Sequence, residues 1–478
     1  MKKDYLKMMR DGLELNSGDQ IKMIFRLSIP AILAQISSII MQYIDASMVG
    51  RLGAGDSASI GLIASSTWLI GGLCSAASTG FSVLIAKRIG AKDFKGARSL
   101  VNTGLFFTAV FSLFLAVTAC AISPFLPVWL GGDESICSGA SVYFLVFSCS
   151  IPVFQLNITS AGMIQCSGNM KVPGALEIIM CVLDVLFNAV LIFPSSTHVL
   201  FGLRFKVYGA GLGLFGSALG TALAELCVTL ILLYYLLAKS KELRLRKNEK
   251  TPFSFSEVRR ALKIALPVAA EQIITCSAYI AFTRIVSPLG TIALAANSFS
   301  ITAESLCYMP GYGIGSASST IIGQSIGAKR NSLSIRLGRL ATLTGVGLMS
   351  FGGILMFFLA PYMIGILTPD PQIRQLGSEV LRIEAFAEPL YAASIVATGV
   401  FRGAGDTIVP TCINLFSMWL IRIPLAAFLA SGFGLRGVWT AMCVELCIRG
   451  SLFIILLLTR FTKRINNGKY QGGIKSEV

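Results

Sequence analysis

Twelve long apolar segments run through the 478-residue chain, and they constrain its fold more than any other feature. Each is long enough for a helix that crosses the hydrocarbon core of a bilayer, which takes about 20 residues. Strands of a membrane barrel would be about half as long and would alternate between polar and apolar residues. We therefore expect an all-α integral membrane protein with twelve transmembrane helices. The segments lie at about residues 24–48, 57–80, 99–123, 140–162, 174–193, 212–237, 261–285, 292–318, 340–360, 376–399, 410–430 and 437–459.

The charge content excludes several classes of protein. Charged residues make up 13% of the chain, about half the usual share in soluble domains. The sequence contains no phosphate-binding loop of the pattern G-x-x-x-x-G-K-[ST] and no loop large enough for a catalytic domain. We therefore expect no enzyme, no cofactor and no ATP-driven pump. Any work must be driven by an ion gradient, unless the protein is a passive facilitator.

Lysine and arginine are distributed very unevenly between alternate loops. If the N-terminus is cytoplasmic, 31 of the 40 basic residues lie on that side and 5 lie outside, with 4 within the spans. Such an excess in cytoplasmic loops predicts that both termini are cytoplasmic. The net charge of +16 is then mostly a consequence of topology, with contact to anionic lipids as a second effect and no nucleic-acid partner.

The two halves of the chain repeat each other at a constant offset. The loop Gly90-Ala91-Lys92 reappears as Gly327-Ala328-Lys329, and Pro30 reappears as Pro267, always 237 positions later. Six spans in each half give the halves the same orientation, so we expect two six-helix lobes that move about a central cleft. The expected segments are an N-terminal tail (1–21), a first lobe (22–237), a basic linker (238–257), a second lobe (258–460) and a C-terminal tail (461–478), with an extra outer stretch near 195–211.

Several motifs resemble those of the multidrug and toxic compound extrusion (MATE) family. They are Asp45-x3-Val49-Gly50-x-Leu52-Gly53, the paired Gly-Ala-Lys loops, and Arg402-Gly403-x-Gly405-Asp406-Thr407 followed by Pro410. The resemblance covers about residues 20 to 460. It implies a multi-pass antiporter of the cell membrane that exports small, amphipathic, often cationic drug-like compounds in exchange for H⁺ or Na⁺ and works as a monomer. A lipid-linked oligosaccharide flippase, which would need basic residues in its cavity, and a receptor without transport are the alternatives.

Two acids inside the first lobe stand out as candidates for ion coupling. Asp45 and Asp184 lie within spans, where a charge is costly, and their repeat partners are apolar. Asn188 lies one turn after Asp184 on the same helix face, and Asn157 offers another amide oxygen. The resemblance implies an ion site formed by an aspartate of the first helix and an Asn/Asp pair of the fifth, although here that pair is in swapped order. Asp45 and Asp184 would also ligate sodium if that is the coupling ion, and the alternative is that they only hydrogen-bond neighbouring helices.

The candidate residues for substrate binding are Glu271, Glu304, Glu388, Tyr279 and Met41. The resemblance implies that acids of the seventh and tenth helices contact the ion or a cationic substrate, whereas aromatic and methionine side chains would line an adaptable cavity. A Glu–Arg pair that joins helices is an equal alternative for the acids. Beyond the extra outer stretch the offset of the repeat drops to 220, which pairs Glu225 with Glu445, so we expect a structural role for both.

Overall fold

The computed structural model describes residues 4–200, 203–246, 249 and 253–470. The first lobe contains α2 (Ser17–Gly50), α3 (Ala54–Gly90), α4 (Phe94–Ile122), α6 (Glu134–Cys166), α7 (Lys171–Ile192) and α8 (Gly213–Tyr234). The second contains α9 (Phe255–Val286), α10 (Thr291–Gly327), α11 (Asn331–Leu367), α12 (Pro371–Ala385), α13 (Glu388–Ala404), α14 (Ile408–Phe416), α15 (Ile423–Leu456) and α16 (Thr462–Asn466). The short elements are α1 (Tyr5–Arg10), α5 (Leu126–Trp129) and an antiparallel hairpin of β1 (Pro194–Leu200) and β2 (Leu203–Ala210).

The twelve predicted spans are recovered as helical segments, although some of them are broken or joined. Nine helices of the described chain are long and apolar enough to cross a membrane, and one of these, residues 408–466, contains two predicted spans. The predicted tenth span is divided into α12 and α13, and Pro389 stands in the first turn of α13, where a missing N–H costs least. The reversal within α15 falls at Gly434, whose φ of 57° favours glycine.

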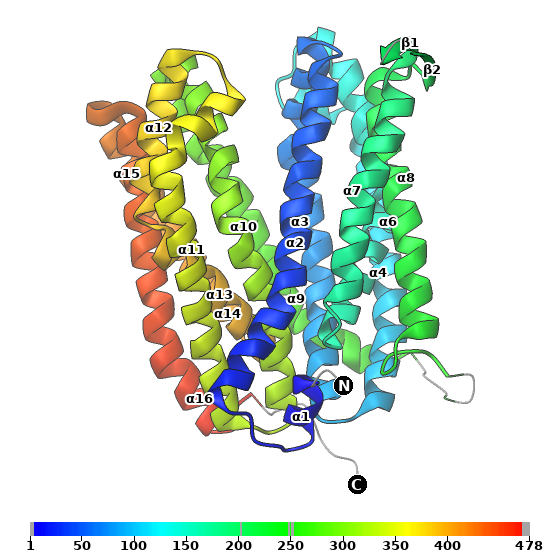
Figure 1. The fold of residues 1–478 in the computed structure, drawn as a ribbon, viewed down its shortest axis with the longest axis vertical. Coiled ribbons are helices and arrows are strands. Elements are labelled where there is room, and N and C mark those ends of the chain that lie inside the picture. The colour runs from blue at the N-terminus through cyan, green and yellow to red at the C-terminus, as the bar shows by residue number, and fades with distance from the viewer. Residues whose placement is uncertain (1–3, 201–202, 247–248, 250–252, 471–478) are drawn as a thin grey trace.

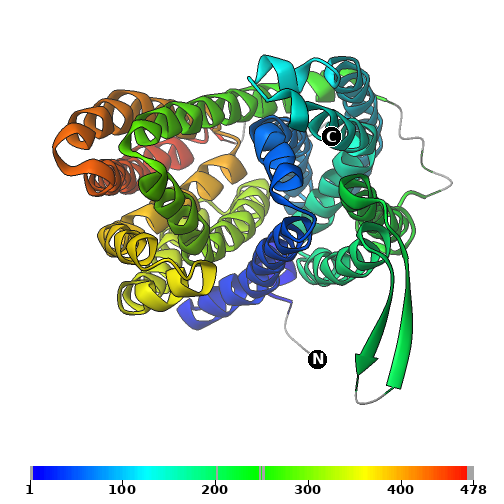
Figure 2. The same cartoon turned by 90° about the horizontal axis from the view of Figure 1, so that it is seen from above.

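The two lobes stand side by side, and the distance between them changes along the length of the bundle. In Figure 1 they diverge toward the end that carries β1 and β2, which we call the hairpin end, and converge toward the end that carries α1 and α16, the closed end. The view from above shows helices of both lobes around a centre, with the hairpin projecting away from the bundle (Figure 2). The predicted extra outer stretch is thus this hairpin, and the expectation of an all-α chain is correct apart from it.

The closed end is held by the repeated Gly-Ala-Lys loops. A Cβ atom on Gly90 would lie 2.1 Å from the backbone oxygen of Gln324, and a Cβ atom on Gly327 would lie 2.1 Å from that of Lys87. Lys87 and Gln324 are themselves repeat partners, so the two lobes meet in a pseudo-symmetric backbone contact. In addition, the Lys87 ammonium donates to the oxygen of Ala404 (2.7 Å) and the Gln324 amide donates to that of Cys166 (2.7 Å). Glycine is required here because any side chain would separate the lobes.

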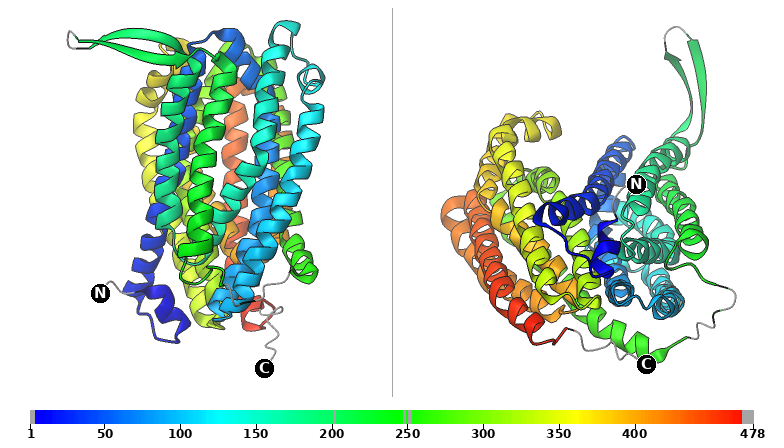
Figure 3. Two further views of the ribbon diagram at one scale, coloured as in Figure 1. Left: turned by 90° about the vertical axis from the view of Figure 1, so that its right-hand side faces the viewer. Right: turned by 60° about the horizontal axis from the view of Figure 1, so that its bottom comes forward.

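Residues near the start of the chain are packed onto the closed end instead of forming a free tail. Met9 is fully buried, and the first spanning helix already begins at Ser17, five residues before the predicted lobe boundary. Asp11 pairs with Lys92 of the first lobe (2.7 Å), while Arg330 of the second lobe donates to the backbone oxygen of Leu13 (2.8 Å). This segment therefore bridges both lobes, below the bundle in Figure 3. The predicted C-terminal tail is also partly ordered, because α16 lies within it, while 471–478 lie outside the described residues.

Gly327→Ala is expected to shift the protein toward conformations in which the closed end is open. The new methyl group would overlap the Lys87 carbonyl, and overpacking costs typically 1–3 kcal/mol, about a 5- to 150-fold change in a two-state ratio. Spin labels at the exposed positions Lys95 and Arg336, in a cysteine-free background, would report a longer mean distance. Gly347→Ala is the control because nothing lies within 4 Å of its Cβ position. Equal distances in both variants would contradict the view that the contact of Gly90 and Gly327 keeps the closed end shut.

Candidate functional site

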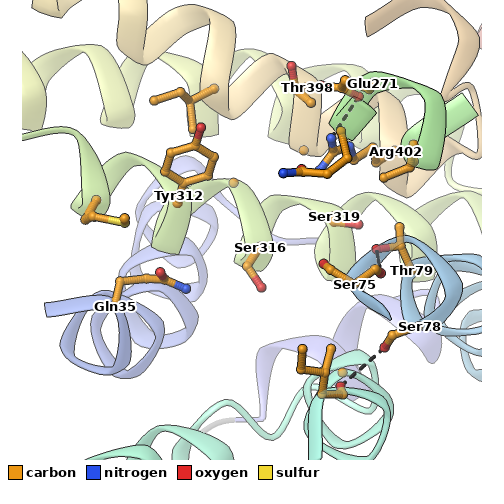
Figure 4. Close-up of a pocket in the computed structure, with 18 of the residues that line it drawn as sticks. Gln35, Ser75, Ser78, Thr79, Glu271, Tyr312, Ser316, Ser319, Thr398 and Arg402 are labelled. Atoms are coloured by element: carbon orange, nitrogen blue, oxygen red, sulfur yellow. Dashed lines mark hydrogen bonds and ion pairs between the residues drawn. The ribbon is translucent and has the colours of Figure 1, made fainter. Parts of the chain in front are cut away.

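A cavity of about 750 Å³ lies between the two lobes. Its walls come from α2, α3, α6, α7 and α8 on one side and from α9, α10, α13, α14 and α15 on the other. Figure 4 shows Gln35 of α2 and the Ser75, Ser78 and Thr79 group of α3 opposite Tyr312 and Ser316 of α10. A volume of this size fits a drug-sized organic molecule.

The cavity ends where the lobes meet. Gln165 of α6 accepts hydrogen bonds from Ser316 (3.2 Å) and Thr320 (3.4 Å) of α10, and all three residues line the cavity. The Gly90 and Gly327 contact lies beyond them toward the closed end. A molecule in the cavity therefore faces a floor made by both lobes, and that floor must separate before the molecule can leave through the closed end.

Glu271, a predicted substrate residue, lies in the cavity wall but is already paired. It accepts from the Arg402 guanidinium (2.9 Å) and from the Asn414 amide (2.6 Å), as the dashed line in Figure 4 marks for Arg402. Arg402 belongs to the Arg-Gly-x-Gly-Asp-Thr motif, whose Asp406 in turn binds Arg464 (2.5 Å). This arrangement corresponds to the predicted alternative of a Glu–Arg pair that joins helices, here α9 and α13.

Three of the four residues predicted to couple ions meet inside the first lobe. The side-chain amide of Asn188 donates to Asp45 Oδ1 (2.9 Å) and to Asp184 Oδ2 (3.1 Å), so one amide joins carboxyls of α2 and α7. Asp184 and Asn188 are fully buried, and Asp45 is partly buried. Gly220 of α8 packs against this group, since a Cβ atom there would lie 2.2 Å from Asn188 Oδ1.

Two oxygen atoms of this cluster lack a hydrogen-bond donor in the described structure. Asp184 Oδ1 and Asn188 Oδ1 are buried and have no hydrogen-bond partner in the described structure. Neither Asp45 nor Asp184 has a basic residue within ion-pair distance among the described residues. Buried charge without a partner costs several kcal/mol, so the cluster favours binding of a proton or a small cation that oxygen atoms can ligate.

The remaining candidate residues lie in different surroundings. Asn157 and Tyr279 line the cavity, and Asn157 has no described hydrogen bond to the aspartates. Met41 packs against the apolar core of the first lobe and is not part of the described cavity wall. Glu304 and Glu388 are buried inside the second lobe, also outside the described wall, and neither carboxylate oxygen of Glu388 has a hydrogen-bond partner among the described residues.

Sequence reasoning missed Glu177 of α7. Its carboxylate lines the cavity and accepts from the Ser38 hydroxyl of α2 (2.8 Å). The signal was present in the sequence, because Glu177 lies within the predicted fifth span and two helical turns before Asp184. Glu225 also lines the cavity, so its position differs from that of its repeat partner Glu445, which is buried against Arg422 (2.7 Å).

The MatE family model matches residues 30–190 and again residues 267–428, the same 237-residue offset that the sequence repeat gives. The chain belongs to the MatE family. This MatE protein is 26% identical over 447 residues, 92% of each chain, to the "Probable multidrug resistance protein NorM" of Thermotoga maritima. It is also 24% identical to the "Uncharacterized transporter YisQ" of Bacillus subtilis, with 94% of this chain and 95% of that protein covered.

Solved structures confirm the fold of this MatE protein. The "Crystal structure of MATE in complex with MaL6" matches 98% of this chain and 100% of its own, with a TM-score of 0.87 and 18% sequence identity. The "Outward-facing conformation of a multidrug resistance MATE family transporter of the MOP superfamily" has a TM-score of 0.86 with the same coverage and identity. The predicted architecture of an all-helical membrane protein in two halves is thereby confirmed.

Proposed function

We propose that this protein exports small, amphipathic, often cationic compounds in exchange for H⁺ or Na⁺. The observation that carries the proposal is the combination, within one lobe, of a cavity wall and a largely buried Asp45–Asn188–Asp184 cluster that has no basic partner among the described residues. The printed names of curated relatives, which include multidrug resistance proteins, support a drug-like substrate. Neither an enzyme activity nor a cofactor is part of the proposal.

The coupling step is a change in the charge of the cluster. When a proton or sodium ion enters, it neutralises carboxylate charge that α2 and α7 bring together, and the two helices can approach more closely. α7 is packed tightly on α2, since a Cβ on Gly174 would lie 2.6 Å from the oxygen of Pro30. Pro30 interrupts the hydrogen bonding of α2 and permits a bend there. Ion binding is thus linked to the shape of the helix that also lines the cavity.

The expected topology determines which side of the membrane each end of the bundle faces. With the basic loops and both termini in the cytoplasm, the closed end faces the cytoplasm and the cavity communicates with the outside. This conformation would release substrate outward and accept the ion. We place the protein in the cell membrane, in contact with anionic lipids through its basic inner loops, and functional as a monomer.

A lipid-linked oligosaccharide flippase is less well supported. Three arginines, Arg402, Arg422 and Arg449, do line the cavity. However, Arg402 is neutralised by Glu271, and the other two contact Glu445. A pyrophosphate group needs free cations, and these arginines already have carboxylate partners.

Transport into proteoliposomes tests the proposal directly. Purified protein is reconstituted, and uptake of ethidium is followed with a pH gradient, a sodium gradient or neither. We expect accumulation against the ethidium gradient with at least one of the two ions and none without a gradient. Movement of lipid-linked sugar without ethidium transport would instead support the flippase, and equilibration of ethidium without any gradient dependence would indicate a facilitator.

Gly220→Ala is expected to lower gradient-driven ethidium transport at least about tenfold without changing any charged residue. The added methyl group would displace the Asn188 amide by overlapping its oxygen, and ion sites are sensitive to such small misplacements. Gly61→Ala is a matched control because its Cβ position has no neighbour within 4 Å. Normal transport by Gly220→Ala would mean that the position of Asn188 is not important for coupling.

A further inference from the structure

The two walls of the cavity differ in how their acids are balanced. On the wall formed by the second lobe, Glu271 is held by Arg402 and Asn414. Arg422 and Arg449 also face the cavity, and both contact the carboxylate of Glu445. Each acid of this wall therefore has a basic partner, and its three arginines outnumber the two carboxylates that they contact, so the wall offers no negative charge to a cation.

The wall formed by the first lobe carries two acids that have no basic partner in the part of the chain that the structure describes. Glu177 of α7 and Glu225 of α8 both line the cavity, and these helices are neighbours. The Ser38 hydroxyl donates to Glu177 (2.8 Å) and fixes the orientation of that carboxylate. No lysine or arginine of the described chain lies within ion-pair distance of either acid. Negative charge in the cavity is therefore concentrated on one side.

A second observation at the same wall also points to a ligand. Asn157 of α6 lines the cavity, is 6% exposed, and its amide nitrogen has no hydrogen-bond partner in the described structure. Trp68 and Phe154, from α3 and α6, supply aromatic surface to the same wall. Buried polar groups are normally hydrogen-bonded, and aromatic faces attract organic cations. The wall thus combines unpaired carboxylates, an unused amide and aromatic rings.

We propose that Glu177 and Glu225 hold the positively charged centre of the transported compound, with Trp68 and Phe154 against its apolar body. This inference rests on the proposed function and names the residues that select a cation. Glu177 lies seven residues before Asp184 on α7, about 10 Å along the helix axis and on the same face. The substrate and the coupling ion therefore act on one helix, which provides a direct route for competition between them.

A pair of ligands of similar shape tests the proposal in purified protein. Tetraphenylphosphonium is a cation, and triphenylphosphine oxide is a neutral compound with similar aromatic rings. We expect Glu177→Gln and Glu225→Gln each to weaken tetraphenylphosphonium binding about tenfold, and to leave triphenylphosphine oxide binding within about threefold. Glutamine keeps the oxygen that accepts from Ser38, so the local hydrogen bond can persist. Glu134→Gln, at an exposed position of α6, is the charge control and should change neither affinity.

The outcomes separate this inference from the proposed function. Equal effects of the glutamine variants on both ligands, or no effect on either, would overturn the role of the two acids. Glu177→Asp, which keeps the charge, should retain most of the preference for the cation, and loss of that preference would indicate a purely structural role. If the wild-type protein transports neither compound under any gradient, the proposed function itself fails, whatever the variants bind.

Discussion

Asp184→Asn is expected to abolish gradient-driven export while leaving the protein folded and able to bind substrate. Asparagine has nearly the same shape and can still accept the hydrogen bond from Asn188, so the change removes only the ionisable charge. One charge that moves through 100 mV provides about 2.3 kcal/mol, roughly a fortyfold concentration ratio. Without that exchange, ethidium should reach equal concentrations on both sides of the proteoliposome membrane.

Two further variants sharpen this prediction. Asp45→Asn should also reduce accumulation, because Asp45 shares the same asparagine amide (2.9 Å). Glu134→Gln again serves as a control, since that acid is exposed at the start of α6 and far along the chain from the cluster. Full accumulation by both aspartate variants would remove the cluster from the coupling mechanism, and the second-lobe acids would then become the candidates.

Glu445→Gln is expected to cause the largest loss of stability among single charge removals. Glu445 is fully buried, accepts a hydrogen bond from Arg422 (2.7 Å) and forms an ion pair with Arg449 (3.3 Å). Both arginines are themselves nearly buried. Removal of one partner from a buried ion pair typically costs 3–5 kcal/mol, because a charge is left without compensation. Unfolding can be followed with a thiol-reactive dye, since all twelve cysteines are free. The midpoint temperature should fall by several degrees.

A surface ion pair of the same length provides the matched control. Glu379 and Arg436 also lie 2.7 Å apart, but their side chains are 31% and 58% exposed. Exposed pairs contribute about 0–1 kcal/mol, so Glu379→Gln should leave the midpoint nearly unchanged. Similar shifts for Glu445→Gln and Glu379→Gln would contradict the view that burial makes the Arg422–Glu445–Arg449 group essential.

The spans and their repeat were predictable because the bilayer imposes a simple rule on composition. Any helix that crosses it needs a long apolar segment, and duplicated halves keep their register. This rule does not predict where a helix is interrupted or how segments outside the bilayer pack. The break between α12 and α13 depends on Pro389, and the packing of Met9 onto the closed end depends on a contact with both lobes.

The candidate site was predictable where a single helix determines the geometry. Asp184 and Asn188 are one turn apart, so their contact follows from the helix period, and Asp45 was identified by the cost of a charge in a span. The role of Glu271 was not predictable, because its partner Arg402 comes from a motif 131 residues away. Glu177 was missed although its position on α7 satisfies the same helix period.

The most direct test of coupling counts the ions released when substrate binds. Tetraphenylphosphonium is added to purified protein in weakly buffered detergent, and released protons and sodium are measured with a pH indicator and a sodium electrode. Exchange requires that each ligand lowers the affinity for the other. We expect the wild-type protein to release a proton or a sodium ion on binding and Asp184→Asn to release none. Binding to the wild-type protein without release of either ion, or equal release by Asp184→Asn, would contradict coupling through this cluster.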